Sequence, residues 1–514
     1  MMTITIRRCA GIALACALSA SAIAADSDKA SATTLLHQAL EAQGGEKALR
    51  AVRNMQWTFA GYRSEIEQSE RPEGPYVTEL DTISETHDYA GNRYRDVTDA
   101  KIYPVFQFSH GTVTTADISM RLTDGKKSAG KPEQIRIASE RMALSPERVL
   151  LTALDARDVH READTVLQSV PQNVIAFTLD AAPATIYLNA YTHLPTAVDY
   201  SGPLARAGFW AFLGDVTART WYGFWWLAKG GIHLPMQWTM EGNGLADRTL
   251  IVKNLQIDAD LKEDDFAVPG DVRAQYKPDA APTSWETLPL GQPATELAPG
   301  IVFIPGAWNV TLVKQDDGIV ILEAPISSGY SAKVIAEAHR RFPGQPIKAV
   351  ITTSDSWPHL SGIREYVAEG IPVYALDLDK PILKRVIDQP HTSKPDRLQE
   401  SPREPIFHLV QDKLVLDSKI NRMEIYPLRG ETTERQLMVY FPKQKFVYGS
   451  DAFQRNPDNS FNLPQTVSEL VDAVKREHLD VTQYFMMHMG LSPWDELQKV
   501  IETAEATNSP SGID

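Results

Sequence analysis

A proline-, alanine- and threonine-rich stretch without a clear period, residues 273–297, separates two segments with different hydrophobic patterns. Before it, apolar and polar residues alternate in short runs, whereas after it short apolar runs alternate with segments of helical period. A chain of 514 residues is too long for one ordinary domain, so this stretch is interpreted as a linker. We predict a leader over 1–25, a first domain over 26–272 and a second domain over 298–514.

The first apolar run has the features of an export signal. Arg7 and Arg8 precede a continuous run of small and apolar residues that ends at the cleavage pattern Ala22-Ile23-Ala24. The run is short for a membrane span, and no later run is long and uncharged enough to cross a bilayer. We therefore expect a cleaved signal peptide, no transmembrane span, and a periplasmic or secreted mature protein.

The positions of the cysteines limit the chemistry of the mature chain. Both of them, Cys9 and Cys16, lie inside the leader, so cleavage leaves neither a disulfide nor a thiolate ligand. Any bound metal must then be held by histidine and carboxylate groups. The net charge of −15 at pH 7 repels phosphate backbones, and we predict no nucleic-acid partner.

Residues 26–272 predict an antiparallel, β-rich domain. Two short helices are expected at 33–43 and 46–52, separated by Gly44-Gly45, and from Met55 onward the period changes to two. Together with the late phrases at 230–235 and 266–269, this order is similar to the periplasmic lipoprotein-carrier type of β-domain. The resemblance implies a curved sheet that can hold an apolar ligand, although such sheets also serve as scaffolds.

A tryptophan-rich segment, residues 207–231, lies within this domain. It holds Trp210, Trp221, Trp225 and Trp226 among the ten tryptophans of the chain. We favour the interpretation that these rings fill a β-rich core. The alternative is an apolar groove or lid for a lipid-like ligand.

The second segment predicts strands alternating with helices. Short buried strands are indicated first, followed by an amphipathic helix, further strand–helix pairs, and a helix that Thr466 and Glu469 are expected to start as a capping box. The expected strands are 301–304, 310–314, 319–322, 347–352, 373–376, 423–427, 436–441, 445–448 and 484–487, and the expected helices are 331–342, 362–368, one from Thr466 and one from Ser492.

This order resembles the metallo-β-lactamase fold, an αββα sandwich, over residues 296–506. The likeness rests on an opening hairpin at 309–324, where Glu323 replaces the usual aspartate, a strand and loop at 347–362, and a later hairpin at 436–451. The resulting fold class is α+β: an antiparallel β-rich domain followed by a metallo-β-lactamase-like sandwich.

The family's metal motif is degenerate in this sequence. Its loop reads T-H-x-H-x-D-H-x-G-G, and here Ser354, Ser356 and Pro358 stand at the positions of two histidines and the aspartate, leaving only His359. The third histidine of the first metal site falls at Glu431. Serine hydroxyls are poor Zn²⁺ ligands and proline offers none, so the resemblance implies that the first site is lost.

The second metal site keeps its ligands according to the same resemblance. His359, Asp451 and His488 match the family positions, which implies at most one divalent ion (zinc, iron or manganese) with an open position for water. Asp451 and Glu431 are the expected catalytic residues, Glu431 as general base if it does not bind the ion. Asp355 is a weaker candidate. The competing interpretation is that these residues are hydrogen-bonded remnants of an ancestral site.

Two functions remain open from the sequence. The first is an exported hydrolase-like protein of the metallo-β-lactamase fold with an altered site and an unknown substrate. The alternative is a non-catalytic periplasmic protein that binds an apolar or envelope-derived ligand. No serine-hydrolase elbow, P-loop or dinucleotide fingerprint is present, and neither substrate nor oligomeric state can be inferred from these residues.

Overall fold

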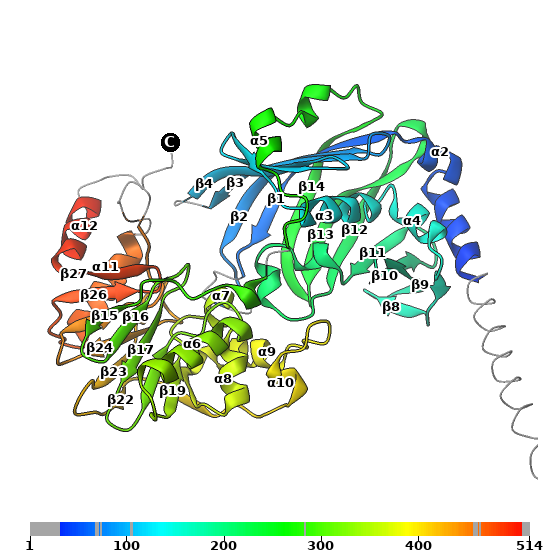
Figure 1. Cartoon of the computed structure of the whole chain (residues 1–514). Coiled ribbons are helices and arrows are strands. Elements are labelled where there is room, and N and C mark those ends of the chain that lie inside the picture. Colours follow the sequence, from blue (N-terminus) through cyan, green and yellow to red (C-terminus); the bar gives the residue numbers. More distant parts are fainter. Residues whose placement is uncertain are drawn as a thin grey trace, which may run out of the picture.

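A computed structural model of the chain describes residues 31–66, 71, 74–102, 106–281, 284–455, 461 and 464–505. The predicted signal peptide therefore lies outside the described residues. Three sheets organise the rest, one of 14 strands, one of seven and one of six (Figure 1). Within the described residues, none of the helices combines the length and apolar character needed to cross a membrane.

The 14-stranded sheet is antiparallel and accounts for the alternating pattern of the first segment. At its centre β1 (Asn54–Ser64) pairs with β2 (Thr78–Asp88) on one side and with β14 (Leu245–Ile257) on the other. Its other strands are β3 (Arg93–Ile102), β4 (Phe106–Thr114), β5 (Ser119–Thr123), β6 (Lys126–Ala129), β7 (His160–Arg161), β8 (Thr165–Leu167), β9 (Val170–Leu179), β10 (Ala182–Asn189), β11 (Pro195–Tyr200), β12 (Ala218–Leu227) and β13 (His233–Gly242).

Helices pack against one face of this sheet, and the core of the first half lies between them and the sheet. A helix over 31–43 and the short helices α2 (Glu46–Ala51), α3 (Glu133–Ala143) and α4 (Val149–Asp155) lie in this segment. Apolar residues of the first helix, α2 and α4 share a buried cluster with Trp57 and Phe59 of β1, whose rings pack against Trp238 of β13 at 5.3 and 4.9 Å between centroids. Helix α3 instead belongs to a small separate cluster with Tyr94 of β3. The sequence therefore predicted the first two helices and the change of period, but it did not predict α3 or α4.

The tryptophan-rich segment divides between the two predicted environments. Trp210 and Trp225 pack against the core, as the first interpretation requires. Trp226, in contrast, is 58% exposed and stands on the outside of β12. Neither interpretation describes the whole segment.

The expected linker contains regular structure at both ends. Residue 273 lies inside α5 (Gly270–Gln275), and residue 297 lies inside β15 (Thr295–Ala298), which pairs antiparallel with β16 (Ile301–Ile304). Because Gly300 adopts a φ of 80°, the chain can turn back tightly between these two strands. The 3₁₀ helices of the chain are η1 (Pro203–Arg206), η2 (Gly208–Phe212), η3 (Lys229–Gly231), η4 (Glu263–Phe266), η5 (Trp285–Thr287) and η6 (Asp377–Asp379).

Two sheets face each other in the second half. The seven-stranded sheet has the order β15-β16-β17-β18-β19-β20-β21, and the six-stranded sheet has the order β22-β23-β24-β25-β26-β27. The remaining strands are β17 (Val310–Lys314), β18 (Ile319–Leu322), β19 (Ile347–Ile351), β20 (Val373–Leu376), β21 (Phe407–Val410), β22 (Leu414–Leu416), β23 (Met423–Pro427), β24 (Leu437–Phe441), β25 (Phe446–Tyr448), β26 (Gln483–Met486) and β27 (Met489–Pro493).

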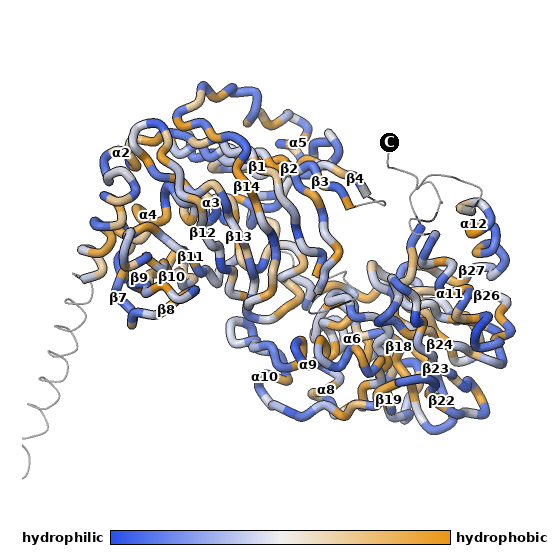
Figure 2. Tube along the Cα trace, turned by 180° about the vertical axis from the view of Figure 1, so that it is seen from behind, coloured by the Kyte–Doolittle hydropathy of each residue, from blue (hydrophilic) through white to orange (hydrophobic). Residues whose placement is uncertain are grey.

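The buried apolar clusters of the second half show that helices cover the outer face of each of its two sheets. One buried cluster joins the two sheets, with Val320 and Ile351 on one side and Val439 and Phe485 on the other. Apolar strands of both sheets carry it, as the hydropathy colouring of Figure 2 shows. The outer faces are covered by α6 (Ser328–Arg341), α7 (Trp357–Leu360), α8 (Ile363–Glu369), α9 (Lys380–Asp388) and α10 (Arg397–Glu400), and by α11 (Pro464–Arg476) and α12 (Asp495–Glu505). This is an αββα sandwich, and the predicted fold class is confirmed.

The predicted capping box at Thr466 is wrong. Helix α11 already begins at Pro464, so Thr466 lies inside its first turn. The Glu469 carboxylate turns away from the helix terminus and accepts hydrogen bonds from the backbone N–H groups and hydroxyls of Thr432 and Thr433. A proline is well tolerated in a first helical turn, and here it starts the helix earlier than the pattern predicted.

A carboxylate of the first half is anchored in a loop of the second. Asp215 accepts hydrogen bonds from the backbone N–H and hydroxyl of Thr392 at 2.6 and 2.5 Å and from those of Ser393. Burial alone would raise the pKa of Asp215, but these donors outweigh it and lower the pKa to about 2. The carboxylate is therefore charged at neutral pH and holds the two loops together.

We expect Asp215→Ala to weaken this contact. Four donors lose their acceptor, which should lower the free energy of unfolding by about 2 kcal/mol and increase proteolytic cleavage near residue 390. Urea denaturation and limited trypsin digestion measure both effects. Asp260→Ala, at an exposed position, is the control, and equal stability of the two variants would contradict the prediction.

Candidate metal centre

The strand order brings the predicted ligands to one edge of the sandwich. Strands β25 and β26 are parallel neighbours, Asp451 follows the first, and His488 follows the second. Because the carboxyl ends of parallel strands meet at the same edge, the two side chains come together. His359 lies on α7, in the loop that follows β19. A hydrogen bond of 3.0 Å from the Met487 N–H to the Ser450 carbonyl joins two of these loops.

Three of the sequence-predicted residues form one compact group. One ligand atom from each of His359, Asp451 and His488 lies within 4.8 Å of the others. Nε2 of His359 is 3.4 Å from Oδ2 of Asp451, and Nε2 of His488 is 3.0 Å from Oδ1. A tetrahedral zinc ion with bonds of about 2.0–2.1 Å keeps its donors about 3.3 Å apart, so these separations suit one ion.

The second nitrogen of each imidazole distinguishes the two histidines. Nδ1 of His488 is 2.8 Å from the carbonyl oxygen of Ala307, an acceptor that directs the Nε2 lone pair toward the group. His359 is 1% exposed, and its Nδ1 has no hydrogen-bond partner among the described residues. His488 thus has the supporting contact typical of a metal ligand, whereas no described polar group supports the Nδ1 side of His359.

The charge states of His359, Asp451 and His488 are compatible with a bound cation. They are also compatible with an ion pair between His488 and Asp451. Burial lowers the pKa of His359 to about 4, so its ring is neutral at pH 7, which is the form that binds metal. Burial opposes the charged form of Asp451 as well, but the two neighbouring histidines outweigh it and lower its pKa. The Asp451 charge in turn raises the pKa of His488 against the effect of burial. Without an ion, a protonated His488 would pair with Asp451.

Buried hydroxyl groups and one buried carboxyl group surround Ser354 and Ser356, which the resemblance aligns with metal ligands. Ser354 and Ser356 are buried, and the Ser356 N–H donates to the hydroxyl of Ser354 at 3.2 Å. The neighbouring Thr353 hydroxyl contacts both Glu323 and Ser450. Burial raises the pKa of Glu323 to about 7.

Glu431 and Asp355 stand outside the group. Strand β23 is parallel to β25 but separated from it by β24, so the two carboxyl ends lie two strand spacings apart, about 9.6 Å. Glu431 follows β23, which explains why its exposed side chain is not a member of the His/Asp/His group. Asp355 is buried in the loop before α7 and does not belong to the group either.

Aromatic side chains from both halves border the group. The Trp308 ring lies 6.4 Å from the rings of both His359 and His488, measured between centroids. Phe212 of η2 packs edge-on against Trp308 at 5.6 Å. Trp210 likewise contacts Trp357 at 5.2 Å, two residues before His359. The first half therefore contributes to the wall beside the candidate site.

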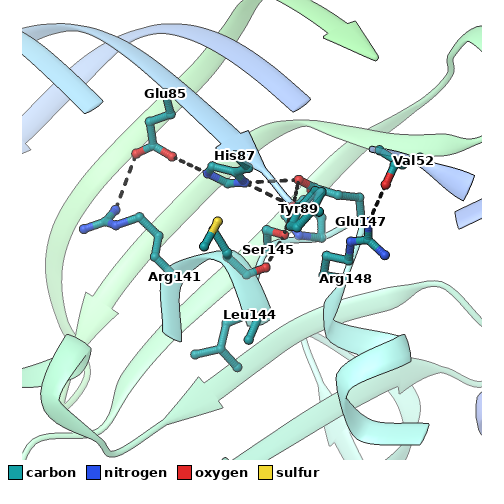
Figure 3. Close-up of polar contacts among 12 residues, drawn as sticks. Val52, Glu85, His87, Tyr89, Arg141, Leu144, Ser145, Glu147 and Arg148 are labelled. Carbon is teal, nitrogen blue, oxygen red and sulfur yellow. Dashed lines mark hydrogen bonds and ion pairs between the residues drawn. The ribbon is translucent and has the colours of Figure 1, made fainter. Parts of the chain in front are cut away.

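A second buried polar cluster was missed by sequence reasoning, which assigned no role to His87. Figure 3 shows that the His87 ring lies between two carboxylates, with Nε2 at 3.2 Å from Glu85 and Nδ1 at 3.2 Å from Glu147. Arg141 reaches Glu85 at 3.4 Å, and the Tyr89 hydroxyl donates to Glu147 at 2.5 Å. The carboxylates approach opposite nitrogens, so this arrangement is an ion-paired core and not a metal site.

The solved structures that resemble this chain match less than half of it. No family model and no curated protein matches the sequence. Among solved structures, a metallo-β-lactamase from Pontibacter korlensis is 15% identical with a TM-score of 0.33, covering 43% of this chain and 100% of its own. The metallo-β-lactamase FIM-1 from Pseudomonas aeruginosa, in its mono-zinc form, is 16% identical with a TM-score of 0.32, covering 43% and 96%. The sec-alkylsulfatase Pisa1 from Pseudomonas sp. is 12% identical with a TM-score of 0.32, covering 41% and 40%.

Proposed function

We propose that the protein is a metal-dependent hydrolase of the metallo-β-lactamase superfamily with an altered site that holds one divalent ion. The observation that supports the proposal most strongly is the convergence of His359, Asp451 and His488 within 4.8 Å, from three separate loops. On the leader sequence alone, we further propose that the mature protein works in the periplasm or outside the cell.

Each of the three side chains has a distinct role in this proposal. A bound divalent ion would lower the pKa of a water molecule and polarise a substrate oxygen. Asp451 supplies the only negative charge of the set and balances the ion, while the Ala307 carbonyl keeps His488 in the ligating tautomer. Zinc is the ion we propose, because nitrogen and carboxylate donors in a tetrahedral spacing suit it.

The surroundings favour a site that excludes water on one side. His359 is almost completely buried, whereas the side chain of His488 is 18% exposed, so a substrate would approach from the side of His488. Trp308 borders this approach. Glu431 remains our proposed general base, acting on the solvent side through a water molecule because it is too far away to bind the ion.

We expect metal-dependent hydrolysis of a simple activated substrate. The zinc-loaded protein should hydrolyse at least one member of a p-nitrophenyl panel (ester, sulfate, phosphate), and His359→Ala should lower kcat/KM about 100-fold or more. His37→Ala, with a side chain 54% exposed, is the matched control and should retain full activity. A protein that is inactive on the whole panel when loaded with zinc, iron or manganese would contradict the hydrolase proposal.

A further inference from the structure

The 14-stranded sheet splits open at one place. Pairing between β13 and β14 runs only from Gln237 opposite Ile251 to Gly242 opposite Leu245. Beyond this point, residues 252–257 of β14 pair with β1, and the start of β13 pairs with β12. Among the described strands none pairs with the second edge of 252–257, so the backbone N–H and C=O groups on that edge have no strand partner.

A groove of about 890 Å³ occupies the split. The end of β12 lines one side, β14 and the residues after it line the other, and Met236 lies between them. The volume falls within the range of ordinary ligand sites. The groove is unrelated to the His/Asp/His group, none of whose members lines it.

Large apolar side chains line the groove while remaining in contact with solvent. Phe224 is 70% exposed, Trp226 58%, Leu227 60% and Ile251 56%. Single exposed apolar residues are ordinary, but four of them around one hollow mark a surface that buries apolar groups of a partner.

A backbone irregularity places one of these rings. Phe224 has a φ of 55° and has no partner in the β12–β13 register, which passes from Gly223 opposite Gln237 to Trp225 opposite Pro235. A positive φ is unfavourable for a phenylalanine, and the strand pairing is interrupted here although the register does not shift. From this position the Phe224 side chain lines the groove.

The groove also carries positive charge within an acidic protein. Lys229 and Lys253 line it, and neither forms an ion pair with a carboxylate of the described residues. The one acidic side chain of the lining, Asp258, accepts a hydrogen bond of 2.7 Å from the Arg53 N–H. Two lysines without partners, in a chain with a net charge of −15, attract a carboxylate from outside.

We propose that this groove binds an extended polypeptide segment carrying acidic and apolar side chains, which adds as a strand to the open edge of β14. An added strand satisfies the unpaired backbone groups of 252–257 and places alternate side chains against Phe224 and Trp226. Lys229 and Lys253 then pair with acidic side chains of the segment. An acyl chain would use only the apolar walls and would leave the backbone edge unpaired.

The test uses a fluorescein-labelled decapeptide of alternating valine and glutamate. We expect saturable binding with a Kd below about 1 mM, and slower hydrogen–deuterium exchange of the amides of 252–257 in the complex. Trp226→Ala and Lys253→Glu should each weaken binding about tenfold. Tyr191→Ala, at a side chain 75% exposed, and Lys126→Glu, at an exposed position, are the matched controls and should not change the affinity.

Three outcomes would overturn the proposal. The first is the absence of binding at 1 mM peptide. The second is binding of dodecanoate that depends on Trp226 without protection of the 252–257 amides, which would identify a groove for lipid chains. The third is protection of these amides in the absence of peptide together with a doubled molecular mass in solution, which would identify an interface between two copies of this chain.

Discussion

Replacing Glu147 by glutamine is expected to lower the free energy of unfolding by about 3 kcal/mol at pH 7. The substitution keeps the shape of the side chain but removes one of the two carboxylates that flank His87, both of them buried. The positive charge of His87 then loses a partner inside the core, where solvent cannot compensate for it. Urea denaturation followed by far-UV circular dichroism measures the loss.

The change of unfolding free energy with pH shows whether pairing with the two carboxylates stabilises the charged form of His87. Burial alone would lower the pKa of His87, but the hydrogen bonds and charges of Glu147 and Glu85 outweigh it and raise the pKa to about 9. A raised pKa contributes stability that is complete below the unfolded value of 6.5 and is lost as the pH rises through 9. The pKa of Glu147 is lowered, so its contribution is present above 4.5 and is lost in acid.

The wild-type protein should therefore lose stability between pH 6.5 and 9, and Glu147→Gln should flatten this decline. The matched control is Glu162→Gln, because Glu162 forms a comparable pair with His160 at 3.0 Å, but with side chains 54% and 46% exposed. An exposed pair of this kind contributes less than about 1 kcal/mol. If both variants were equally stable, the buried cluster would not hold the charges that its geometry indicates.

The sequence predicted most strands of the second half because they are short, apolar and bounded by turn residues. It missed β21, β22, α9 and α10, and the helix expected from Ser492 is wrong there, because Ser492 lies in β27 and α12 begins at Asp495. Strands β20 (Val373–Leu376) and β23 (Met423–Pro427) agree with the expected limits at both ends. The predicted linker was less accurate, because β15 is polar at its first residues and becomes a strand only through pairing with β16. Tertiary context decides the structure of such segments.

The two polar clusters show what a sequence pattern can and cannot reveal. His359, Asp451 and His488 were identified because a family resemblance assigns positions that lie far apart in the chain. Nothing comparable marks the His87 cluster. Glu85 and His87 alternate on β2 as on any half-exposed strand, and their partners Arg141 and Glu147 come more than fifty residues later in the chain. The clue was a histidine two residues after a glutamate, on the same face of a strand, which becomes informative only once burial is known.

Removal of metal from the His/Asp/His group is expected to have the other large effect. The zinc-replete protein should contain about one ion per chain, and at a free zinc concentration 1,000 times Kd the ion adds about 4 kcal/mol to the free energy of unfolding. Asp451→Asn removes the only anionic donor while preserving the size of the side chain. We therefore expect both the bound ion and the zinc-dependent rise of Tm to disappear in this variant.

The matched control for this experiment is Glu431→Gln. Glu431 is exposed and does not belong to the His/Asp/His group, so the variant should retain one ion and the full rise of Tm, and it should lose hydrolysis only if Glu431 is the base. Loss of the ion in Glu431→Gln would mean that Glu431 moves in to bind the metal. A wild-type protein without a stoichiometric ion after zinc, iron and manganese supplementation would show that Asp451 pairs with the two histidines for structure alone. In that case Asp451→Asn should still lower Tm, because His488 would lose the carboxylate that lies 3.0 Å from its Nε2.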